Sequence, residues 1–391
     1  MKKPSLLYAS PFAPMKSGIS DYSEELVEEL QKKFELTLYI GDYQLTNRTL
    51  QNISHVVRHG RDSIDFDSYD YKIYNMGNNP EYHAYIYEAC LRYPGVVILH
   101  DLVLYYLFVG YYQGKGKLYS KTYSNEGLDA LLKLKRAVKK DGPRLLEQKH
   151  MSGKLPMNHE LFRSQNRFIV HSQYTYDKII KTGLVETDRI RKINQFMKMD
   201  EMLISKKELF EKYRIPLDAC IVTSMGNIGS TKLNHIVCQA VKRYVRETGT
   251  KVCYVMVGEG DYADEYVDGK VVIKTGYTKE EEFNSFIEYS DIIFNLRNPS
   301  MGETSRTMLQ IMQKGKVSVI NEGGWFSEIP DDCVIKISLD NMVEQIQEVL
   351  KDFLHDSGRF ERICDRAKEY MAQEYSTTRI ANEIEEFVCE K

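Results

Sequence analysis

Polar residues that could hold a phosphate gather in the stretch "RNPSMGETSRTMLQIMQKGKVSVI", which runs from Arg297 to Ile320. Gly302 opens a cluster in which Glu303 carries a carboxylate and Arg306 a guanidinium, ahead of an amphipathic segment that stops at Gly315. Backbone N–H groups at the start of a helix favour phosphate, because they have no partner within the helix. The residue types therefore indicate a phosphate site with a carboxylate and a guanidinium beside it.

A strand and a helix must position this cluster. We expect a strand over "DIIFNL" that ends near Arg297, a loop, and a helix that begins near Glu303 or Thr304. Glu303, Arg306 and Gln310 would then share a polar stripe on one helix face. The alternative is that Glu303 and Thr304 only cap the helix, since acidic and hydroxyl residues are common in first turns.

Two other regions place polar residues at the ends of predicted strands. "TSMGNIGSTKLNH" leaves a strand, turns through two glycines and sets Lys232 at the next helix start, where an ammonium could meet a pyrophosphate. In the first half, Gly18 precedes a helix, and "VILHD" ends a strand with His100 and Asp101. In an open parallel sheet ligands bind at the carboxyl ends of the strands, so we expect these sites to converge on one cleft.

Composition excludes several classes of protein. The chain has 391 residues and a formal net charge of −3, which describes a globular protein with no broad charge for coating nucleic acid. Seven cysteines are scattered without CxxC or Cys/His spacing, which predicts reduced core thiols and a cytoplasmic location. The longest apolar run, "LVLYYLFVGYY" from Leu102, is too short to span a bilayer.

Strand-like runs alternate with amphipathic helices in both halves of the chain, which predicts an α/β fold of two Rossmann-like domains with parallel sheets. We expect the domains at 1–200 and 201–370, with the join in the polar, helical stretch 198–216. Residues 104–165 show no convincing strand and predict a helical insertion in the first domain.

A basic segment lies within the predicted insertion, over residues 132–140. Its cations are Lys133, Lys135, Arg136, Lys139 and Lys140. They could meet an anionic lipid head group or an acidic acceptor. The alternative is a solvated helix face, which charge runs of this kind usually form.

Asp65 and Asp67 match the Asp-x-Asp signature of metal-dependent GT-A transferases, but a three-residue match is weak. We interpret them as part of a solvated acidic loop and expect no metal and no cofactor.

The chain resembles the retaining GT-B glycosyltransferases of family four over nearly its whole length. The stretches that carry the resemblance are "SPFAPMKSGISDYSEEL", "YNMGNNPEYH", "GVVILHDLVLYYLF", "KLPMNHELF", "FIVHSQYT", "VTSMGNIGSTKLN", "VMVGEG", "FNLRNPSMGETSRTMLQIMQKGKVSVINEGGWFSEIPDD" and "EYMAQEYSTTRIANEI". The resemblance implies a nucleotide-sugar donor held mainly by the second domain, an acceptor held mainly by the first, and chemistry in the cleft where the two domains face each other. It also implies that a last helix, within 371–391, packs back on the first domain.

Carried over to this sequence, the resemblance implies Lys232, Glu303 and His100 as catalytic residues. The alternative for His100 is a neutral structural histidine at a strand end. The resemblance also implies donor-binding residues at Gly18, Asn227, Lys232, Arg297, Gly302, Glu303, Thr304, Ser305, Arg306 and Gln310. Two departures stand out. Registered on Gly315, the family's Glu-x7-Glu pair falls on Gly302, with Glu303 one place later, and on Gln310. An arginine that the family places near the phosphate-binding lysine is replaced by Asn227.

The resemblance implies transfer of a sugar to a glycan, lipid-linked or protein acceptor with retention of anomeric configuration. In the front-face mechanism of such enzymes a leaving phosphate oxygen takes the acceptor proton, so no strong protein base is required. Cations and N–H dipoles aimed at the phosphates would supply most of the catalysis, with Lys232 and the amides of Gly302–Thr304 as candidates. The alternatives are a catalytically silent subunit that supports a partner transferase and a nucleotide-sugar epimerase.

Overall fold

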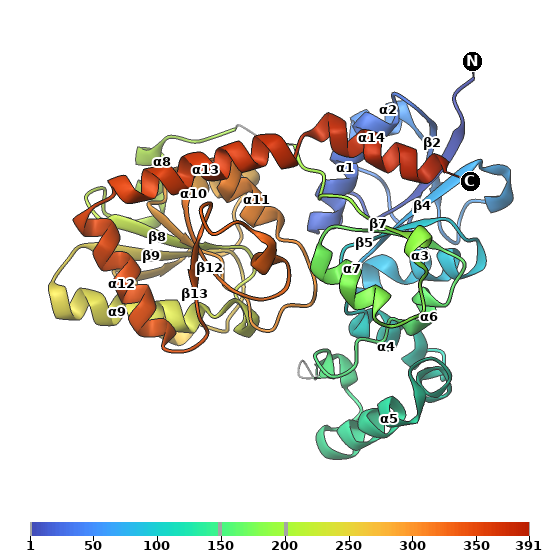
Figure 1. Ribbon diagram of the computed structural model, residues 1–391, viewed down its shortest axis with the longest axis horizontal. Helices are drawn as coiled ribbons and strands as arrows, with labels where there is room; N and C mark the ends of the chain where they lie inside the picture. The colour runs from blue at the N-terminus through green and yellow to red at the C-terminus, as the bar shows by residue number, and fades with distance from the viewer. Residues whose placement is uncertain (1, 148–150, 199–201, 391) are drawn as a thin grey trace. The chain divides into compact units, whose positions relative to one another are not determined.

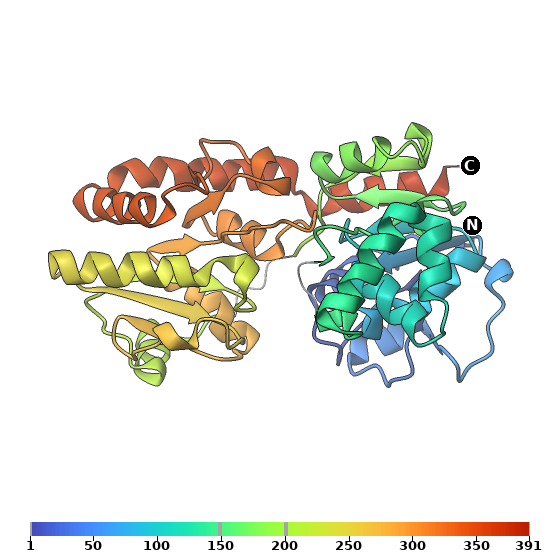
Figure 2. The same cartoon turned by 90° about the horizontal axis from the view of Figure 1, so that it is seen from below.

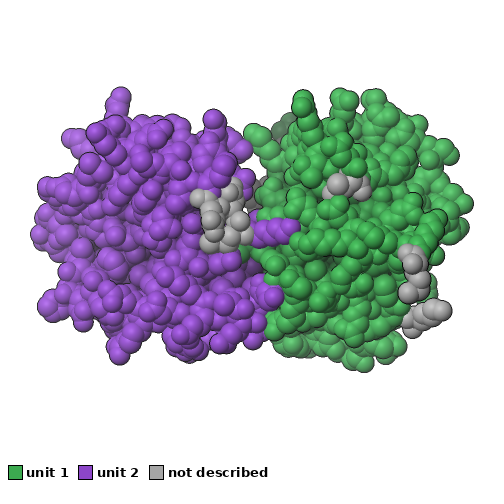
Figure 3. Space-filling view, turned by 90° about the horizontal axis from the view of Figure 1, so that it is seen from above, with its two compact units in different colours: residues 1–197, 301–304, 377–391 green, residues 198–300, 305–376 purple. Residues whose placement is uncertain are grey.

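The computed structural model describes residues 2–147, 151–198 and 202–390 (Figure 1). The chain divides into two compact units (Figure 3). Unit 1 comprises residues 1–197, 301–304 and 377–391, and unit 2 comprises residues 198–300 and 305–376. Within the described residues, none of the helices is both long enough and apolar enough to cross a membrane.

Unit 1 is built on a parallel sheet of seven strands in the order β3-β2-β1-β4-β5-β6-β7. The strands are β1 (Ser5–Ala9), β2 (Glu35–Ile40), β3 (His55–Arg58), β4 (Tyr71–Met76), β5 (Val96–Leu99), β6 (Arg167–Val170) and β7 (Ile190–Lys192). Their central residues are buried in near-continuous apolar runs, as expected of a parallel sheet covered on both faces.

Helices cover both faces of the unit 1 sheet (Figures 1 and 2). They are α1 (Gly18–Leu30), α2 (Arg48–Ile53), α3 (Pro80–Arg92), α4 (Tyr105–Gln113), α5 (Leu118–Asp141), α6 (His159–Phe162), α7 (Gln173–Ile180) and α14 (Thr377–Cys389). Helix α1 lies on the face that carries Tyr8, whose hydroxyl donates to Ser23 Oγ of α1 at 3.2 Å. The neighbouring residue Leu7 faces the opposite core with α3 and α4, since strand side chains alternate.

The final helix, α14, belongs to unit 1, where it packs against α1 and β4. Lys33 Nζ donates to Asn382 Oδ1 at 2.6 Å and forms an ion pair with Glu385. Arg167 and Arg191 both pair with the carboxylate of Glu390, at 2.9 and 2.6 Å.

Between β5 and β6, the described residues form helices and loops without a strand: α4, α5, the 3-10 turn η2 (Leu145–Glu147) and α6. Helix α5 is broken at Gly127, whose φ of 87° lies in the left-handed region. The prediction that this segment is a helical insertion is confirmed.

Unit 2 contains a parallel sheet of six strands in the order β10-β9-β8-β11-β12-β13. The strands are β8 (Cys220–Met225), β9 (Val252–Val257), β10 (Val272–Lys274), β11 (Ile292–Phe294), β12 (Val317–Asn321) and β13 (Ile335–Ile337). One face packs against α9 (Asn234–Thr248) and α12 (Met342–His355), and the other against α8 (Lys206–Tyr213), α10 (Glu280–Tyr289) and α11 (Arg306–Gln313). Helix α13 (Gly358–Glu374) packs against α11.

The prediction of two Rossmann-like parallel-sheet domains is confirmed by these two sheets. One strand, β3, was not predicted. Its sequence "HVVR" has only two apolar residues, and His55 is exposed, because β3 lies at the edge of the sheet. An edge strand needs no continuous apolar run, so it leaves a weak pattern in the sequence.

Candidate functional site

In unit 2, glycines let two strand-end loops pack backbone against backbone. A Cβ on Gly258, after β9, would lie 2.1 Å from the carbonyl oxygen of Gly226, after β8. A Cβ on Gly260 would lie 2.1 Å from the carbonyl oxygen of Ile228, whose N–H donates to Glu259 O at 2.6 Å. Gly258 and Gly260 of "VGEG" are therefore required by contact between the two loops, and Gly226 of "MGNIG" suits its φ of 89°, at the carboxyl edge of the sheet where such folds bind ligands.

Lys232 lies at this edge, in the 3-10 turn η5 (Ser230–Lys232). Its Nζ donates to the carbonyl oxygen of Met225, the last residue of β8, at 3.3 Å. The neighbouring Thr231 carbonyl accepts the Asn298 N–H at 2.8 Å, which ties the turn to the loop after β11. The lysine predicted to meet a pyrophosphate is thus held, half-buried, at the carboxyl end of a central strand.

Asn321, the last residue of β12, holds the loop that carries Arg297. The Arg297 N–H donates to Asn321 Oδ1 at 2.7 Å, and Asn321 Nδ2 donates to the Arg297 carbonyl at 2.8 Å. The sequence analysis did not single out Asn321. The signal that marks it is a buried polar residue at the end of the apolar strand "VSVIN".

Helix α11 begins later than predicted, at Arg306, and its N-cap is Ser305. Ser305 Oγ accepts the Met308 N–H at 3.2 Å and receives a hydrogen bond from Asn295 Nδ2 at 3.2 Å. A serine held in extended backbone satisfies an unpaired donor of the first turn, so the chain enters the helix here. The prediction that the helix begins near Glu303 or Thr304 is therefore wrong.

This correction also places Glu303 in the loop before the helix. Its carboxylate accepts the N–H of Met301 at 2.7 Å, while the N-cap of α11 is Ser305. The predicted stripe is reduced to Arg306 and Gln310, four residues apart on α11, while Glu303 stands outside the helix.

The short segment 301–304 belongs to unit 1. Gly302 has a φ of 83°, and a Cβ there would lie 2.6 Å from Leu102 Cβ. Its carbonyl accepts from Thr175 Oγ1 at 2.9 Å, and the Val103 N–H donates to the Met301 carbonyl at 3.3 Å. The segment that carries Glu303 is therefore seated on the loop that follows His100.

His100, predicted at the end of β5, is a neutral hydrogen-bonding group. Its Nε2 lies 3.1 Å from Asn75 Oδ1, and Asn75 Nδ2 donates to the Ala9 carbonyl at 3.3 Å. The amide oxygen thus faces the imidazole, which assigns the proton to Nε2 and the lone pair to Nδ1. Burial, with the nearby His171 and His83, holds the His100 pKa well below its ordinary value.

Two further buried histidines, His83 and His171, lie near His100. His83 Nδ1 donates to the Asn75 carbonyl at 3.1 Å, and His171 Nδ1 donates to the Ile193 carbonyl at 2.9 Å. Burial lowers the pKa of each to about 4. The rings of His100 and His171 lie 5.2 Å apart, and Tyr22 approaches His100 edge-on at 4.8 Å.

These depressed pKa values predict acid sensitivity. Both imidazoles stay neutral in the folded chain to about pH 4, whereas unfolded histidine protonates near pH 6.5. Stability should therefore be full above pH 6.5 and should fall by about 1.4 kcal/mol per histidine per pH unit towards pH 4. Urea unfolding at several pH values should show a smaller slope in His83→Asn and the original slope in the exposed His355→Asn. An equal slope in all three proteins would contradict this assignment.

Gly18, predicted to lie beside the donor, is the first residue of α1. Ser17 caps the helix by accepting the N–H groups of Ile19 and Ser20 at 3.1 and 3.4 Å. A Cβ on Gly18 would meet nothing within 4 Å. Contacts within the described residues therefore do not explain the glycine, and close approach of a ligand to the helix start stays a prediction.

The Asp65–Asp67 pair forms a capped turn. Asp65 Oδ1 accepts the Asp67 N–H at 3.1 Å at the start of η1 (Phe66–Ser68), and both carboxylates are exposed. Across the described ranges, no group of three or more His, Cys, Asp or Glu side chains is arranged to hold a metal. Metal independence stays a prediction.

The predicted site residues fall into two sets. Those in unit 2 are Asn227, Lys232, Arg297, Ser305, Arg306 and Gln310, and those in unit 1 are Gly18, His100, Gly302, Glu303 and Thr304. His100 follows the end of a parallel strand and Gly18 begins a helix, Gly302, Glu303 and Thr304 lie in the loop between β11 and α11, and Gln310 lies one turn into α11. The cleft implied by the family resemblance stays a prediction.

Comparisons with known proteins place this architecture among solved structures. No protein-family model and no curated protein sequence matches the chain. Anabaena HepE in complex with UDP is similar over 99% of both chains, at 15% identity and a TM-score of 0.65. WaaG, a glycosyltransferase involved in lipopolysaccharide biosynthesis, is similar over 99% of this chain and 100% of its own, at 12% identity and a TM-score of 0.63. Sucrose-phosphate synthase from Thermosynechococcus elongatus covers 98% of both chains, at 12% identity and a TM-score of 0.63. The chain therefore has the GT-B glycosyltransferase fold.

Proposed function

We propose that the protein is a glycosyltransferase that moves a sugar from a nucleoside-diphosphate sugar to an acceptor. The observation that carries the proposal is the arrangement at the ends of β8 and β9 in unit 2. There, two glycine-containing loops pack against each other and Lys232 supplies an ammonium half-buried at the strand end. Two structures of the similarly folded HepE, one with UDP and one with UDP-glucose, support this class of donor.

The proposed roles in unit 2 follow from charge. Cleavage of a sugar–diphosphate bond builds negative charge on the leaving group, so the Lys232 ammonium stabilises the transition state more than the ground state. Arg297 and Arg306 offset the charge lost where Asn227 replaces the family's arginine. Gln310, on α11, donates or accepts a hydrogen bond with the ribose hydroxyls, as an amide can do both.

In unit 1, the proposed roles of His100 and Glu303 are hydrogen bonds to sugar hydroxyls. The lone pair on His100 Nδ1 accepts from a hydroxyl group, while its low pKa makes the imidazole a weak base. The resemblance to retaining enzymes leads us to propose retention with front-face attack, in which the bond from the anomeric carbon to the phosphate oxygen breaks. The acceptor oxygen then bonds to that carbon, and its proton passes to the leaving phosphate oxygen.

A panel of purified nucleotide sugars, beginning with UDP-glucose, tests the proposal by thermal shift and then by donor turnover. Release of nucleoside diphosphate with a new glycosidic product supports a transferase. The silent-subunit alternative rests on Gln310 and Asn227, which each lack a charge that the family carries. Binding without turnover on any acceptor would favour that alternative, and conversion to an altered nucleotide sugar alone would favour an epimerase.

The outer face of α5 supports peripheral contact with an anionic membrane at the cytoplasmic face. Leu128 and Leu132 are 58% and 40% exposed, opposite the buried Ala130 and Leu134. Lys135, Arg136 and Lys139 are exposed around the two leucines, a pattern typical of helices that lie in a bilayer interface.

This surface yields a prediction for vesicle binding. More of the protein should co-sediment with phosphatidylglycerol-containing vesicles than with vesicles of pure phosphatidylcholine. Each exposed cation near an anionic membrane surface contributes about 1 kcal/mol to the binding free energy. Substitution of Lys135, Arg136 and Lys139 together by Glu should weaken binding at least tenfold. The single variant Lys351→Glu, on α12, is the control and should bind like the original protein. Equal binding to both kinds of vesicle would remove the membrane proposal.

A further inference from the structure

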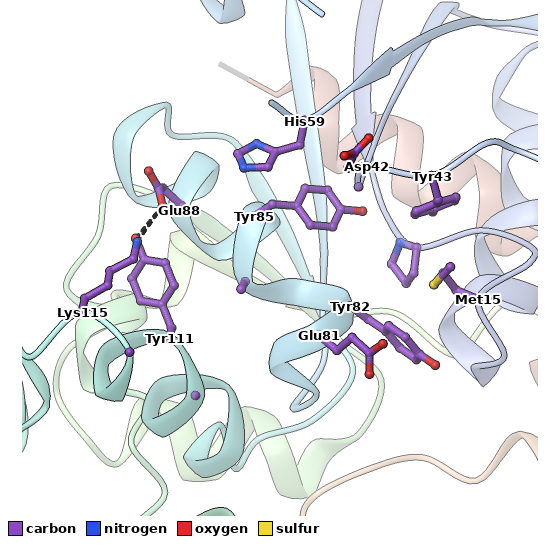
Figure 4. A pocket seen from close by; sticks show the side chains of 15 residues that line it. Met15, Asp42, Tyr43, His59, Glu81, Tyr82, Tyr85, Glu88, Tyr111 and Lys115 are labelled. Atoms are coloured by element: carbon purple, nitrogen blue, oxygen red, sulfur yellow. Dashed lines mark hydrogen bonds and ion pairs between the residues drawn. The ribbon is translucent and has the colours of Figure 1, made fainter. Parts of the chain in front are cut away.

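A cavity of about 580 Å³ lies wholly within unit 1 and is lined by none of the predicted site residues. Its wall comes from the loops after β1, β2 and β3 and from α3 and α4 (Figure 4). It therefore stands at the carboxyl edge of the parallel sheet, where such folds bind ligands, and its volume is within the usual range for small-molecule sites. Met15 in its wall is three residues from Gly18, so both belong to the same loop.

Tyrosine rings dominate the wall. Three of the tyrosines use their hydroxyl groups within the protein, each at 2.9 Å: Tyr43 accepts the Phe12 N–H, Tyr85 donates to the Ser10 carbonyl, and Tyr111 donates to Glu88. Burial raises the pKa of Tyr43 to about 12, so its hydroxyl is neutral. Because the hydroxyl groups are engaged, what these side chains offer to a ligand is the ring, and the C–H groups of a pyranose pack well on aromatic rings.

The charged groups in the wall are mostly carboxylates. Asp42 forms an ion pair with Arg61, and Glu88 accepts from Lys115 at 2.9 Å. Lys115 also lies 3.7 Å from the centre of the Tyr111 ring, so the one ammonium in the wall is already engaged.

The carboxylate of Glu81 differs from those of Asp42 and Glu88 in its contacts. Figure 4 shows its side chain beside that of Tyr82. Within the described residues the Glu81 carboxylate makes no hydrogen bond or ion pair, and it is exposed. Carboxylate oxygens accept hydrogen bonds from hydroxyl groups and repel phosphate and sulfate. Among the described lining residues, the wall thus combines ring surfaces and the His59 imidazole, whose Nδ1 lies 2.6 Å from the Tyr39 hydroxyl, with the available carboxylate of Glu81, while the Lys115 ammonium is engaged.

We propose that this cavity binds uncharged sugar residues of the acceptor, which makes the acceptor a glycan that contains a neutral saccharide. The proposal rests on the proposed glycosyltransferase function. Tyrosine rings bind the C–H faces of the saccharide, and Glu81 accepts hydrogen bonds from its hydroxyl groups. The same lining disfavours phosphorylated, sulfated or otherwise anionic acceptors at this point.

Two variants of α3 test the cavity without altering the tyrosines that are bonded to the backbone. Ala84→Trp places an indole in the cavity, and Tyr82→Ala removes a ring whose hydroxyl has no partner within the described residues. The full-length protein is screened against immobilised neutral, amino, phosphorylated and sulfated oligosaccharides, and Kd values are then measured by calorimetry. We expect a neutral glycan to bind and both variants to raise its Kd at least tenfold, with unchanged melting temperature.

The matched control is Tyr123→Ala, because Tyr123 is an exposed tyrosine of α5 outside the cavity, and its Kd should not change. Donor turnover by the unsubstituted protein is measured separately, so failure of the enzyme proposal is distinguished from failure of the cavity proposal. Binding that survives Ala84→Trp, selection of phosphorylated or sulfated glycans, or no glycan binding by a protein that turns over its donor would each overturn the cavity proposal.

Discussion

Replacement of Lys232 by alanine is expected to lower kcat on the true donor at least a hundredfold, the largest loss among the variants considered. The ammonium is held at the end of β8 by its bond to the Met225 carbonyl, so it is oriented before the ligand arrives. A preorganised cation that meets developing charge on a diphosphate is worth about 3 kcal/mol or more in the transition state. Steady-state kinetics on the purified variant measures the effect.

The control for this prediction is Lys251→Ala, which removes an exposed lysine near the start of β9. It should leave kcat unchanged, and both variants should melt near the temperature of the original protein. Lys232→Arg keeps the positive charge and should recover part of the activity. A folded Lys232→Ala protein with near-normal kcat would remove this lysine from the donor site.

The second large effect is expected for Glu303→Gln, with kcat lowered at least tenfold and little change in melting temperature. The amide oxygen of glutamine can still accept the Met301 N–H, so the loop keeps its internal hydrogen bond. What is lost is the charge. The hydrogen bond between a carboxylate and a donor-sugar hydroxyl becomes stronger as the sugar ring gains positive charge in the transition state. The hydrogen bond to a neutral amide is strengthened less.

Two further variants serve as comparisons for Glu303→Gln. Gln310→Glu restores the second carboxylate of the family's pair and should keep activity or tighten donor binding. Glu348→Gln changes an exposed carboxylate on α12 and should have no effect. Full activity of Glu303→Gln would show that the carboxylate serves only the loop, and its role in holding the sugar would be abandoned.

Much of the fold was predictable because it depends on local patterns. Parallel strands covered on both faces are mostly apolar runs, and "VCYVMV" is such a run in β9. Helices that cover them show the 3.6-residue period, as α9 and α12 do. The edge strand β3 was missed because "HVVR" has only two apolar residues, which is too short an apolar run to indicate a strand.

The candidate site was predictable in its residue types and less so in its contacts. Lys232 and His100 stand at strand ends, as their place after apolar runs predicted. The start of α11 was wrong by two or three residues, because three consecutive polar residues could each cap a helix. Asn295, a buried partner on the preceding strand end, decides in favour of Ser305.

The sequence by itself determined the α/β class, both parallel sheets, the helical insertion and the strand-end positions of the candidate residues, since each follows from the order of apolar and polar residues along the chain. Tertiary structure decided which glycine meets which backbone, as between Gly258 and Gly226, and that Asn321 holds the loop of Arg297. It also placed the segment 301–304 against Leu102 and Thr175 of unit 1. It brought together the residues that line the tyrosine-rich cavity. These contacts join residues far apart in the chain, and their energy depends on positions in space that no local pattern of residues encodes.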